Sequence, residues 1–352
     1  MSSPTVAGGG DPGHTSRGLQ TALLRSVSRS LSPSIRFAPA KLSDPIARAY
    51  LPPRPTATVP DTGQICTSGR TQTTNLLSAV IQGTASRDVV AGLVAGFVPL
   101  QENTSERQLL ESLHDCLAWL DRMEHTDKND IRLVLEKIMR GQMLDLQRFD
   151  DPNEIRALGT AADLDEYTYL VAGCVGEVWT QLCCGHVRNV ANRGQDEMMP
   201  LGKRDGMALQ LMNVLRDAGS DLRVGRCYFP EYELTAAHLS PSQIFAEPKR
   251  FQPIYRPWLD KARAGLESGM EYSRAINNRR VRVATVLPAL IGARTLALLD
   301  AEGAMVLQRT VKVPRREVRV MILSLGMSLA SRGVTNAMFK RAADVKDIAR
   351  KS

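Results

Sequence analysis

Helical periodicity runs through most of this chain and constrains its fold more than any other feature. Apolar residues recur at spacings of three and four, whereas the alternation expected of strands is scarce. The periodic segments are residues 71–83, 105–123, 127–149, 164–187, 203–218, 240–247, 250–268, 276–299 and 315–331. Turn-forming residues interrupt them at 192–196, 225–230 and 300–303, and no fixed repeat or long linker lies between residues 70 and 330. The sequence therefore predicts one all-α domain with helices around a central apolar cavity.

The charge balance of the chain narrows its expected partners. Lys and Arg number 45 against 37 Asp and Glu, a net charge of +8, which favours an anionic partner. Aromatic residues make up only 5% of the chain, and no zinc-finger, helix-turn-helix or RNA-recognition signature is present. The charge fits a diphosphate substrate, an anionic membrane surface and nucleic acid alike, but without such a signature nucleic acid is not expected to bind.

The two ends of the chain are expected to lie outside the folded domain. Residues 1–20 are rich in Gly, Ser, Pro and Thr without the apolar run of a secretory signal, which predicts a disordered tail. Residues 346–352 are predicted to form a basic tail, which leaves 21–345 as the domain. No uninterrupted apolar span reaches the roughly 18 residues of a transmembrane helix, so the segments 89–100 and 283–299 are expected to be buried core helices.

The six cysteines indicate reduced thiols rather than disulfides or a zinc site. They form no C-x-x-C pair, which is typical of an intracellular protein. Cys183 and Cys184 precede His186, but neighbouring side chains point to different sides of a helix and no second ligand pair follows. A zinc site is therefore not expected.

A row of polar side chains lies on the helix predicted around residues 203–218. Asn213, Asp217 and Asp221 recur every fourth residue, so they project from one helix face at one-turn spacing. Mg²⁺ prefers oxygen ligands and commonly joins a few carboxylates to substrate phosphates. Arg216 and Arg226 are near in sequence, and a guanidinium group matches phosphate oxygens. A solvated helix face is the alternative reading of such spacing.

Small residues follow a tyrosine within the segment 164–187. Tyr167 lies one turn before Val171, and Ala172, Gly173 and Gly176 follow. Such small side chains allow either a long apolar ligand or the backbone of another helix to come close. Both readings, a cavity wall and tight helix packing, remain open at this point.

These two segments and several shorter ones resemble the squalene and phytoene synthases. The resemblance runs from about residue 23 to residue 343, with matching pieces at 28–30, 34–37, 44–46, 49–51, 167–176, 210–221 and 287–290. It implies the isoprenoid synthase fold and a Mg²⁺-dependent head-to-head condensation of two prenyl diphosphates. Two farnesyl diphosphates giving presqualene diphosphate and then squalene, with NADPH as reductant, is the first expectation. A phytoene or dehydrosqualene synthase is the alternative.

The resemblance also implies roles for individual residues. Tyr167 and Tyr50 are the implied catalytic residues, and Asp61, Asp217 and Asp221 are the implied metal ligands. The implied substrate-binding residues are Ser28, Arg29, Arg54, Gln210, Asn213, Arg216, Arg226 and Lys312. The implied cavity residues are Val171, Ala172, Gly173, Gly176, Leu287 and Pro288.

The first aspartate motif departs from the family pattern. The family has D-x-x-x-D where this chain reads residues 54–61, and Ala57 replaces the first aspartate, which leaves Asp61. Alanine cannot ligate a cation, and each proline inside a helix costs roughly 3 kcal/mol. The prolines of this stretch are Pro52, Pro53, Pro55 and Pro60. The chain is therefore expected to be a weakened or inactive relative that binds prenyl diphosphate or acts as a scaffold, or to have rebuilt this side of the site with other ligands.

The resemblance and the basic end of the chain together indicate where in the cell the protein is expected to work. Eukaryotic squalene synthases carry a C-terminal membrane anchor, whereas residues 340–351 here are polar and basic. We therefore expect a cytoplasmic, monomeric, bacterial-type enzyme with peripheral contact at the inner membrane. A membrane-associated helical binding protein without a diphosphate role is the remaining alternative.

Overall fold

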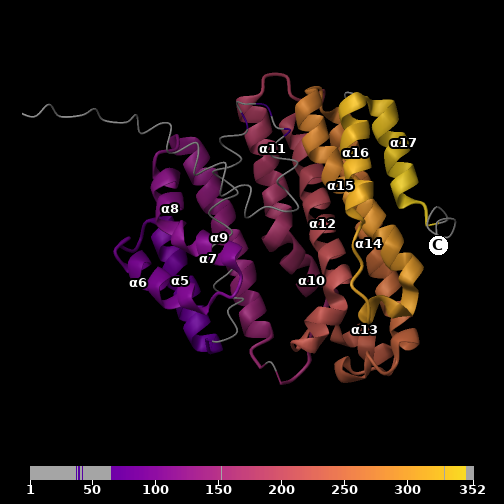
Figure 1. Cartoon of the computed structure of the whole chain (residues 1–352), viewed down its shortest axis with the longest axis horizontal. Helices are drawn as coiled ribbons and strands as arrows, with labels where there is room; N and C mark the ends of the chain where they lie inside the picture. The colour runs from indigo at the N-terminus through magenta and orange to yellow at the C-terminus, as the bar shows by residue number, and fades with distance from the viewer. Residues whose placement is uncertain are drawn as a thin grey trace, which may run out of the picture.

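The part of the chain that the structure describes is almost entirely helical. The computed structural model describes residues 37, 39, 42, 65–151, 153–328 and 330–345 (Figure 1). The helices are α5 (Thr67–Gln82), α6 (Val89–Phe97), α7 (Thr104–Glu111), α8 (Leu113–Asp121), α9 (His125–Arg148), α10 (Ala161–Thr168), α11 (Cys174–His186), α12 (Gln195–Arg223), α13 (Glu231–Ala236), α14 (Pro248–Ala275), α15 (Arg279–Glu302), α16 (Arg315–Met327) and α17 (Arg332–Ala343). Short 3₁₀ segments lie at Val98–Leu100, Pro241–Gln243 and Gly303–Leu307. The all-α prediction is confirmed.

Several boundaries differ from the periodicity, each for a local reason. Residues 240–247 form only the 3₁₀ turn Pro241–Gln243, which makes the helix predicted there wrong. Ser240 caps this turn, and Pro248 starts α14 a few residues later, so no room remains for a longer helix. The segment 164–187 contains a π-helical turn, Tyr169–Gly173, between α10 and α11. A small parallel pair of strands, β1 (Arg156–Leu158) and β2 (Arg226–Pro230), was not foreseen.

Helix α12 is the central element of the fold. It packs against α11, α14 and α15, and Figure 1 shows it in the middle of the bundle. Its apolar residues Leu211 and Leu215 belong to the main buried cluster, together with Phe229 of β2, Tyr255 of α14 and Leu287 of α15. This packing fixes α12 on one side, so its polar face is held toward α9 and α10.

The two most apolar segments of the sequence differ in how far they are buried. The stretch Arg279–Leu307 is long and apolar enough to cross a membrane, but 78% of its most apolar window is buried inside the protein. The core-helix prediction for residues 283–299 is therefore confirmed. Helix α6 instead buries only Val90 and Phe97, and Ala91 and Ala95 are exposed. The core-helix prediction for residues 89–100 is wrong, because α6 lies at the edge of the molecule (Figure 1).

Asp205 of α12 gives the fold a predicted pH dependence. Its Oδ1 atom is buried without a hydrogen-bond partner beside Gly269 of α14, and burial raises the pKa of this carboxyl from 3.8 to about 7. The folded-state pKa exceeds the unfolded one, so only the folded protein keeps this proton between about pH 4 and pH 7. The contribution of the bound proton to the free energy of unfolding is therefore lost as pH rises through that window. We expect Asp205→Asn to abolish this contribution and to be more stable than wild type above pH 7.

Thermal unfolding midpoints measured across that pH range check the prediction. The matched control is Asp196→Asn, which changes an exposed carboxylate on the first turn of the same helix and should leave the wild-type profile in place. Parallel pH profiles for wild type and Asp205→Asn would contradict the assignment.

Candidate functional site

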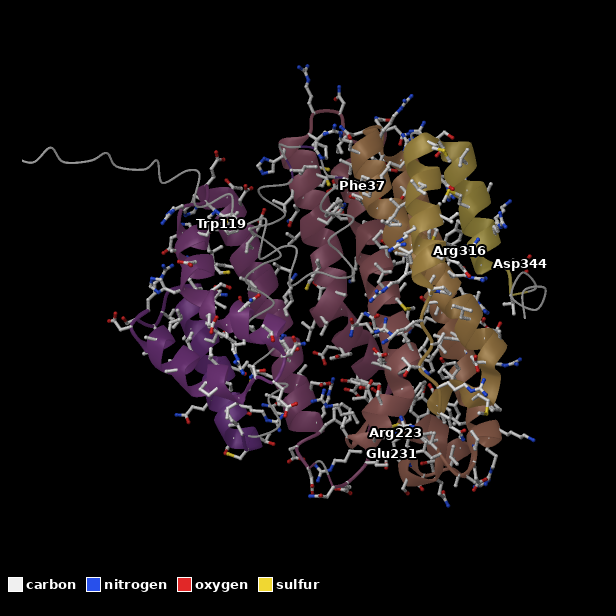
Figure 2. All side chains as sticks on the ribbon, viewed as in Figure 1. Phe37, Trp119, Arg223, Glu231, Arg316 and Asp344 are labelled. Carbon is white, nitrogen blue, oxygen red and sulfur yellow. The ribbon has the colours of Figure 1, made fainter. Side chains whose placement is uncertain are left out.

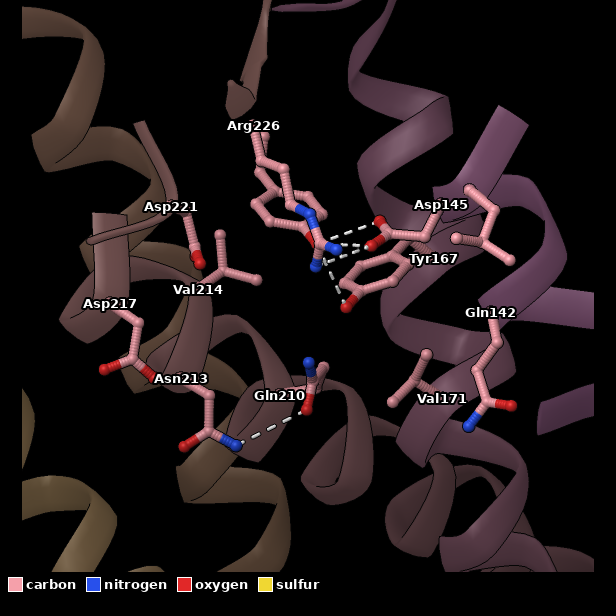
Figure 3. Close-up of a pocket in the computed structure, with 12 residues that line it drawn as sticks. Gln142, Asp145, Tyr167, Val171, Gln210, Asn213, Val214, Asp217, Asp221 and Arg226 are labelled. Carbon is pink, nitrogen blue, oxygen red and sulfur yellow. Dashed lines mark hydrogen bonds and ion pairs between the residues drawn. The ribbon is translucent and has the colours of Figure 1, made fainter. Parts of the chain in front are cut away.

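A pocket opens between α9, α10, α12 and β2. Its volume is about 260 Å³, and Figure 3 shows side chains from these elements converging on it. The lining residues are Gln142, Asp145, Leu146, Tyr167, Val171, Gln210, Asn213, Val214, Asp217, Asp221, Arg226 and Tyr228. Polar groups thus line much of the pocket, with a few apolar side chains between them.

Helix α12 supplies the polar row that the sequence predicts. Gln210, Asn213, Asp217 and Asp221 all line the pocket, so this face of α12 is not simply a solvated one. Asn213 Nδ2 donates to Gln210 Oε1 at 3.4 Å, a weak hydrogen bond. The row follows from helical geometry, since residues four apart stack on one face.

Asp217 is held by its neighbour Arg216. The Arg216 Nε atom donates to Asp217 Oδ1 at 2.8 Å, and Nη2 donates to Oδ2. Asp217 raises the pKa of the Arg216 guanidinium through this hydrogen bond. The Asp217 side chain remains 39% exposed, so a cation or a diphosphate in the pocket can reach it.

The facing wall contains Asp145 of α9. Tyr228 donates its hydroxyl proton to the Asp145 carboxylate, with oxygen–oxygen distances of 2.8 and 3.0 Å. Arg226 Nη1 lies 3.3 Å from Asp145 Oδ2, and the Asp145 side chain is only 12% exposed. A hydrogen bond and an ion pair therefore fix this carboxylate at the edge of the pocket.

Tyr167 lies between these groups and the apolar part of the pocket. Its ring stacks on that of Tyr228 at a centroid distance of 4.9 Å, and the two hydroxyl oxygens are 3.4 Å apart. Burial, reinforced by the Asp145 carboxylate, raises the pKa of Tyr167 far above its ordinary value. Tyr167 therefore stays protonated near neutral pH.

The other residues predicted for the site fall into several groups. Of the predicted cavity residues, Val171 lines the pocket, whereas Ala172, Gly173 and Gly176 pack against α12. Leu287 is buried in the main core, and Pro288 lies beside it on α15. Lys312 is exposed in the loop before α16 and does not line this pocket. Ser28, Arg29, Tyr50, Arg54 and Asp61 lie outside the described residues.

For the three small residues, the helix-packing reading fits the structure. A Cβ atom on Gly176 would lie 2.0 Å from the backbone oxygen of Gly202 on α12, and a Cβ on Gly206 would lie 2.3 Å from the oxygen of Ala172. The two helices therefore cross with their backbones in contact. This contact brings the Tyr167 segment and the polar row of α12 to the same pocket.

Sequence reasoning did not assign five of the lining residues to the site, and one of them, Val214, lies on α12. Gln142, Asp145 and Leu146 lie on α9, and Tyr228 lies on β2. A usable signal was present, since Asp145 is a single carboxylate between Leu144 and Leu146 within a predicted amphipathic helix. An isolated charge among apolar residues indicates either a buried ion pair or a binding site.

The donor set of the pocket suits a hard cation together with a phosphate. Asn213, Asp217 and Asp221 offer oxygen atoms, as Mg²⁺ requires, and Arg226 is placed to meet phosphate oxygens. In the part of the chain that the structure describes, no three His, Cys, Asp or Glu side chains form a group that could hold a metal ion by themselves. A cation here would therefore need substrate oxygens and water to complete its coordination.

Comparison with known proteins decides the family. A sequence model of the squalene/phytoene synthase family matches residues 24–317. The chain belongs to this family. Members of the squalene/phytoene synthase family condense prenyl diphosphates head to head.

Among its relatives, a 15-cis-phytoene synthase of Synechococcus elongatus is 29% identical over 179 residues, covering 46% of this chain and 58% of the relative. A bifunctional lycopene cyclase/phytoene synthase of Arthroderma gypseum is 30% identical over 131 residues, covering 36% of this chain. The matched segment spans only 22% of that fungal protein.

Solved structures confirm the fold of this squalene/phytoene synthase family member. The complex of TcSQS with the ligand E5700 superposes with a TM-score of 0.73 at 19% identity, covering 93% of this chain and 89% of the other. Squalene synthase HpnC from Alicyclobacillus acidocaldarius gives a TM-score of 0.55 at 18% identity, covering 82% and 95%. The expected isoprenoid synthase fold is therefore confirmed.

Proposed function

We propose that this protein condenses two prenyl diphosphates head to head in the pocket between α9, α10, α12 and β2. The observation that carries the proposal is the convergence of Asn213, Asp217 and Asp221 on one pocket with Tyr167 and Arg226, within a chain of this family. Two farnesyl diphosphates are the proposed substrates, with squalene as product and NADPH as reductant. Geranylgeranyl diphosphate and phytoene are the second candidates, because relatives near 30% identity are phytoene synthases.

Different residues of the pocket have different roles in the proposed reaction. Asn213, Asp217 and Asp221 would hold Mg²⁺, which supplies Lewis-acid stabilisation of the leaving diphosphate when bound. Arg226, held by Asp145, is oriented to bind diphosphate oxygens.

The apolar side of the pocket serves the allylic cation that remains. Val171, Leu146 and Val214 keep water from it, and the stacked rings of Tyr167 and Tyr228 offer an electron-rich face to a positive centre. Joining two chains in such a pocket depends mainly on holding the reacting carbons together.

Product analysis tests the proposal. Purified protein is incubated with farnesyl diphosphate, Mg²⁺ and NADPH, and the organic extract is analysed for squalene and its cyclopropyl precursor. A parallel reaction with geranylgeranyl diphosphate is analysed for phytoene. Ala57→Asp, which restores the first aspartate of the family motif, is expected to raise turnover.

The alternative role is binding without turnover, and Ala57 is the observation that favours it. Binding of a prenyl diphosphate with no product from either substrate, in wild type and in Ala57→Asp, would overturn the catalytic proposal. It would support a prenyl-diphosphate-binding or scaffold protein.

We also propose that the protein works as a monomer in the cytoplasm, with peripheral contact at the inner membrane. The net charge of +8 and the apolar nature of the proposed products support this setting.

The Tyr167 hydroxyl is expected to contribute to turnover without ionising. Tyr167→Phe keeps the stacked ring and removes the hydroxyl, so we expect kcat to fall roughly 10- to 100-fold, the equivalent of one hydrogen bond to a charged group. KM should change little. Because burial raises the pKa of Tyr167, the alkaline limb of the pH–rate profile should be the same in both proteins.

Steady-state kinetics across the pH range provide the measurement. Tyr232→Phe is the control, because Tyr232 is 54% exposed and does not line the pocket. Full activity of Tyr167→Phe would show that Tyr167 serves only in packing.

A further inference from the structure

Helix α16 presents an apolar row to solvent. Val320, Leu323 and Met327 are 55%, 63% and 82% exposed, and their spacing of three and four places them on one helix face. Val334, at the start of α17, is 39% exposed. Four of the nine large exposed hydrophobic residues in the described part of the chain thus lie within residues 320–334. We call these four residues the apolar stripe.

Positive charge surrounds the apolar stripe. Residues 308–343 contain eight cationic side chains, Arg309, Lys312, Arg315, Arg316, Arg319, Arg332, Lys340 and Arg341. The same residues contain a single acid, Glu317, and Arg294 of the core helix α15 binds it at 2.8 and 3.3 Å. Arg309 pairs with Glu302 at 3.5 Å, and Asp344 follows directly after these residues. Among the described residues, however, no carboxylate pairs with Arg315, Arg316 or Arg319.

The arginines at the start of α16 are not placed for helix stability. Arg315, Arg316 and Arg319 occupy its first turns, where the helix dipole disfavours cations. Arg315, Arg316 and Arg319 are also exposed (Arg316 is labelled in Figure 2). An unfavourable placement that packing does not require indicates a role toward a partner.

A second cationic group lies at the other end of α16. A pocket of about 470 Å³ is lined by Asn277, Arg279, Arg282, Ser328, Ser331 and Arg332, and no carboxylate is among these described residues. We call it the arginine pocket. Ser328 directly follows Met327, the most exposed residue of the apolar stripe, so the two features adjoin.

Arg282 makes the arginine pocket a built feature rather than a loose group of surface side chains. It is only 7% exposed, and its guanidinium donates to the carbonyl oxygens of Ile276 at 2.6 Å and Ala330 at 2.9 Å. Burial, together with the nearby charges of Arg332 and Arg279, lowers its pKa. A buried guanidinium bound only to carbonyls keeps a net positive charge, which an anion entering the pocket would neutralise.

We propose that α16 and the arginine pocket form a docking surface for an anionic lipid bilayer. The helix lies in the membrane plane, the apolar stripe enters the acyl boundary, and the arginine pocket receives a headgroup phosphate. The 13 residues of α16 separate the two cationic groups by roughly 20 Å, so both meet the same surface. This inference deepens the proposed membrane contact and does not depend on turnover.

A second copy of the chain fits this surface poorly. In a two-fold contact centred on α16, each cationic end would face a cationic end of the other copy, whichever way the helices run. A bilayer with anionic headgroups supplies both the apolar depth and the negative charge that the surface lacks.

Vesicle co-sedimentation of the full chain, without substrate, tests the proposal. We expect binding to vesicles of phosphatidylcholine with phosphatidylglycerol, little binding to phosphatidylcholine alone, and a decline as NaCl screens the charges. Leu323→Asp and Arg316→Glu should each weaken binding about 10-fold or more. The matched controls are Leu133→Asp, whose leucine is 57% exposed on α9, and Arg122→Glu at the end of α8, and both should bind as wild type does.

A separate set of measurements tests the role of the arginine pocket. Arg279→Ala should weaken binding to the anionic vesicles, since Arg279 is an exposed member of the pocket. Binding of inorganic phosphate is measured by calorimetry in parallel. Phosphate binding that Arg279→Ala removes, without any vesicle binding, would assign the pocket to a soluble anion and overturn the proposal.

Three further results would overturn it. The first is that Leu323→Asp binds vesicles as well as Leu133→Asp does. The second is loss of vesicle binding in Ala95→Asp instead, which would place the contact on the exposed face of α6, at the opposite side of the molecule (Figure 1). The third is a wild-type dimer that Leu323→Asp converts to a monomer, with no vesicle binding. Thermal unfolding of each variant confirms that the comparison is made on folded protein.

Discussion

Asp217→Asn is expected to abolish Mg²⁺-dependent binding of a prenyl diphosphate. Asparagine keeps the shape of the side chain and removes its charge, so one of the two carboxylates on this face of α12 no longer attracts the cation. We expect the Mg²⁺-dependent part of the affinity to fall about 100-fold or more, and turnover to fall at least as far, because metal stabilisation of the leaving group is worth several kcal/mol. Calorimetric titration with a non-hydrolysable farnesyl thiodiphosphate, with and without Mg²⁺, measures the effect.

The ion pair with Arg216 requires a matched control for this substitution. Asp300→Asn removes a comparable carboxylate, which binds Arg263 Nη2 at 2.7 Å away from the pocket. Asp300→Asn should leave Mg²⁺-dependent binding intact. Unchanged binding in Asp217→Asn would remove Asp217 from the metal site, and an equal loss in both variants would attribute the effect to stability.

The sequence was sufficient for one wall of the pocket because that wall lies on a single helix. The spacing of Asn213, Asp217 and Asp221 determines a common face in any α-helix, so no tertiary information is needed. Asp145 was not predicted, since its place opposite this face depends on how α9 packs against α11 and the π-helical turn. Arg226 was predicted as a phosphate ligand, but its ion pair with Asp145 became visible only in the structure.

The same distinction explains which elements of the fold were found. Core helices such as α14 and α15 were predicted because their apolar periodicity continues over many turns. The 3₁₀ turn at Pro241–Gln243 was mistaken for a helix because a short apolar run has little periodicity to read. Helix α17 was not predicted. Only Thr335 and Ala342 of its residues are buried, so its sequence indicates a buried helix face only weakly.

The role of the small residues that follow Tyr167 could be assigned only with tertiary information. A glycine fits a ligand wall and a helix crossing equally well, so the sequence cannot separate the two readings. The distance between the backbones of α11 and α12 separates them, and it favours the crossing.

Gly176→Ala is therefore expected to destabilise the protein and to open the pocket. The new Cβ atom would lie 2.0 Å from the backbone oxygen of Gly202 and 2.6 Å from its carbon, and backbone atoms cannot move aside as a flexible side chain can. The helices must separate, and overpacking of this kind typically costs about 1–3 kcal/mol or more. Alanine gains up to about 1 kcal/mol in helix propensity, which offsets only part of this cost. Chemical denaturation should show a net loss in the free energy of unfolding.

Gly185→Ala in the same helix is the control that distinguishes the steric effect at the helix crossing from the effect of helix propensity. No heavy atom would lie within 4 Å of a Cβ on Gly185, so this variant should gain stability, by up to about 1 kcal/mol. Because α12 carries Asn213, Asp217 and Asp221, separation at Gly176 should also weaken Mg²⁺-dependent diphosphate binding, whereas Gly185→Ala should leave it unchanged. If both variants are stabilised alike, the backbones of α11 and α12 are not in contact, and the crossing does not hold the two walls of the pocket together.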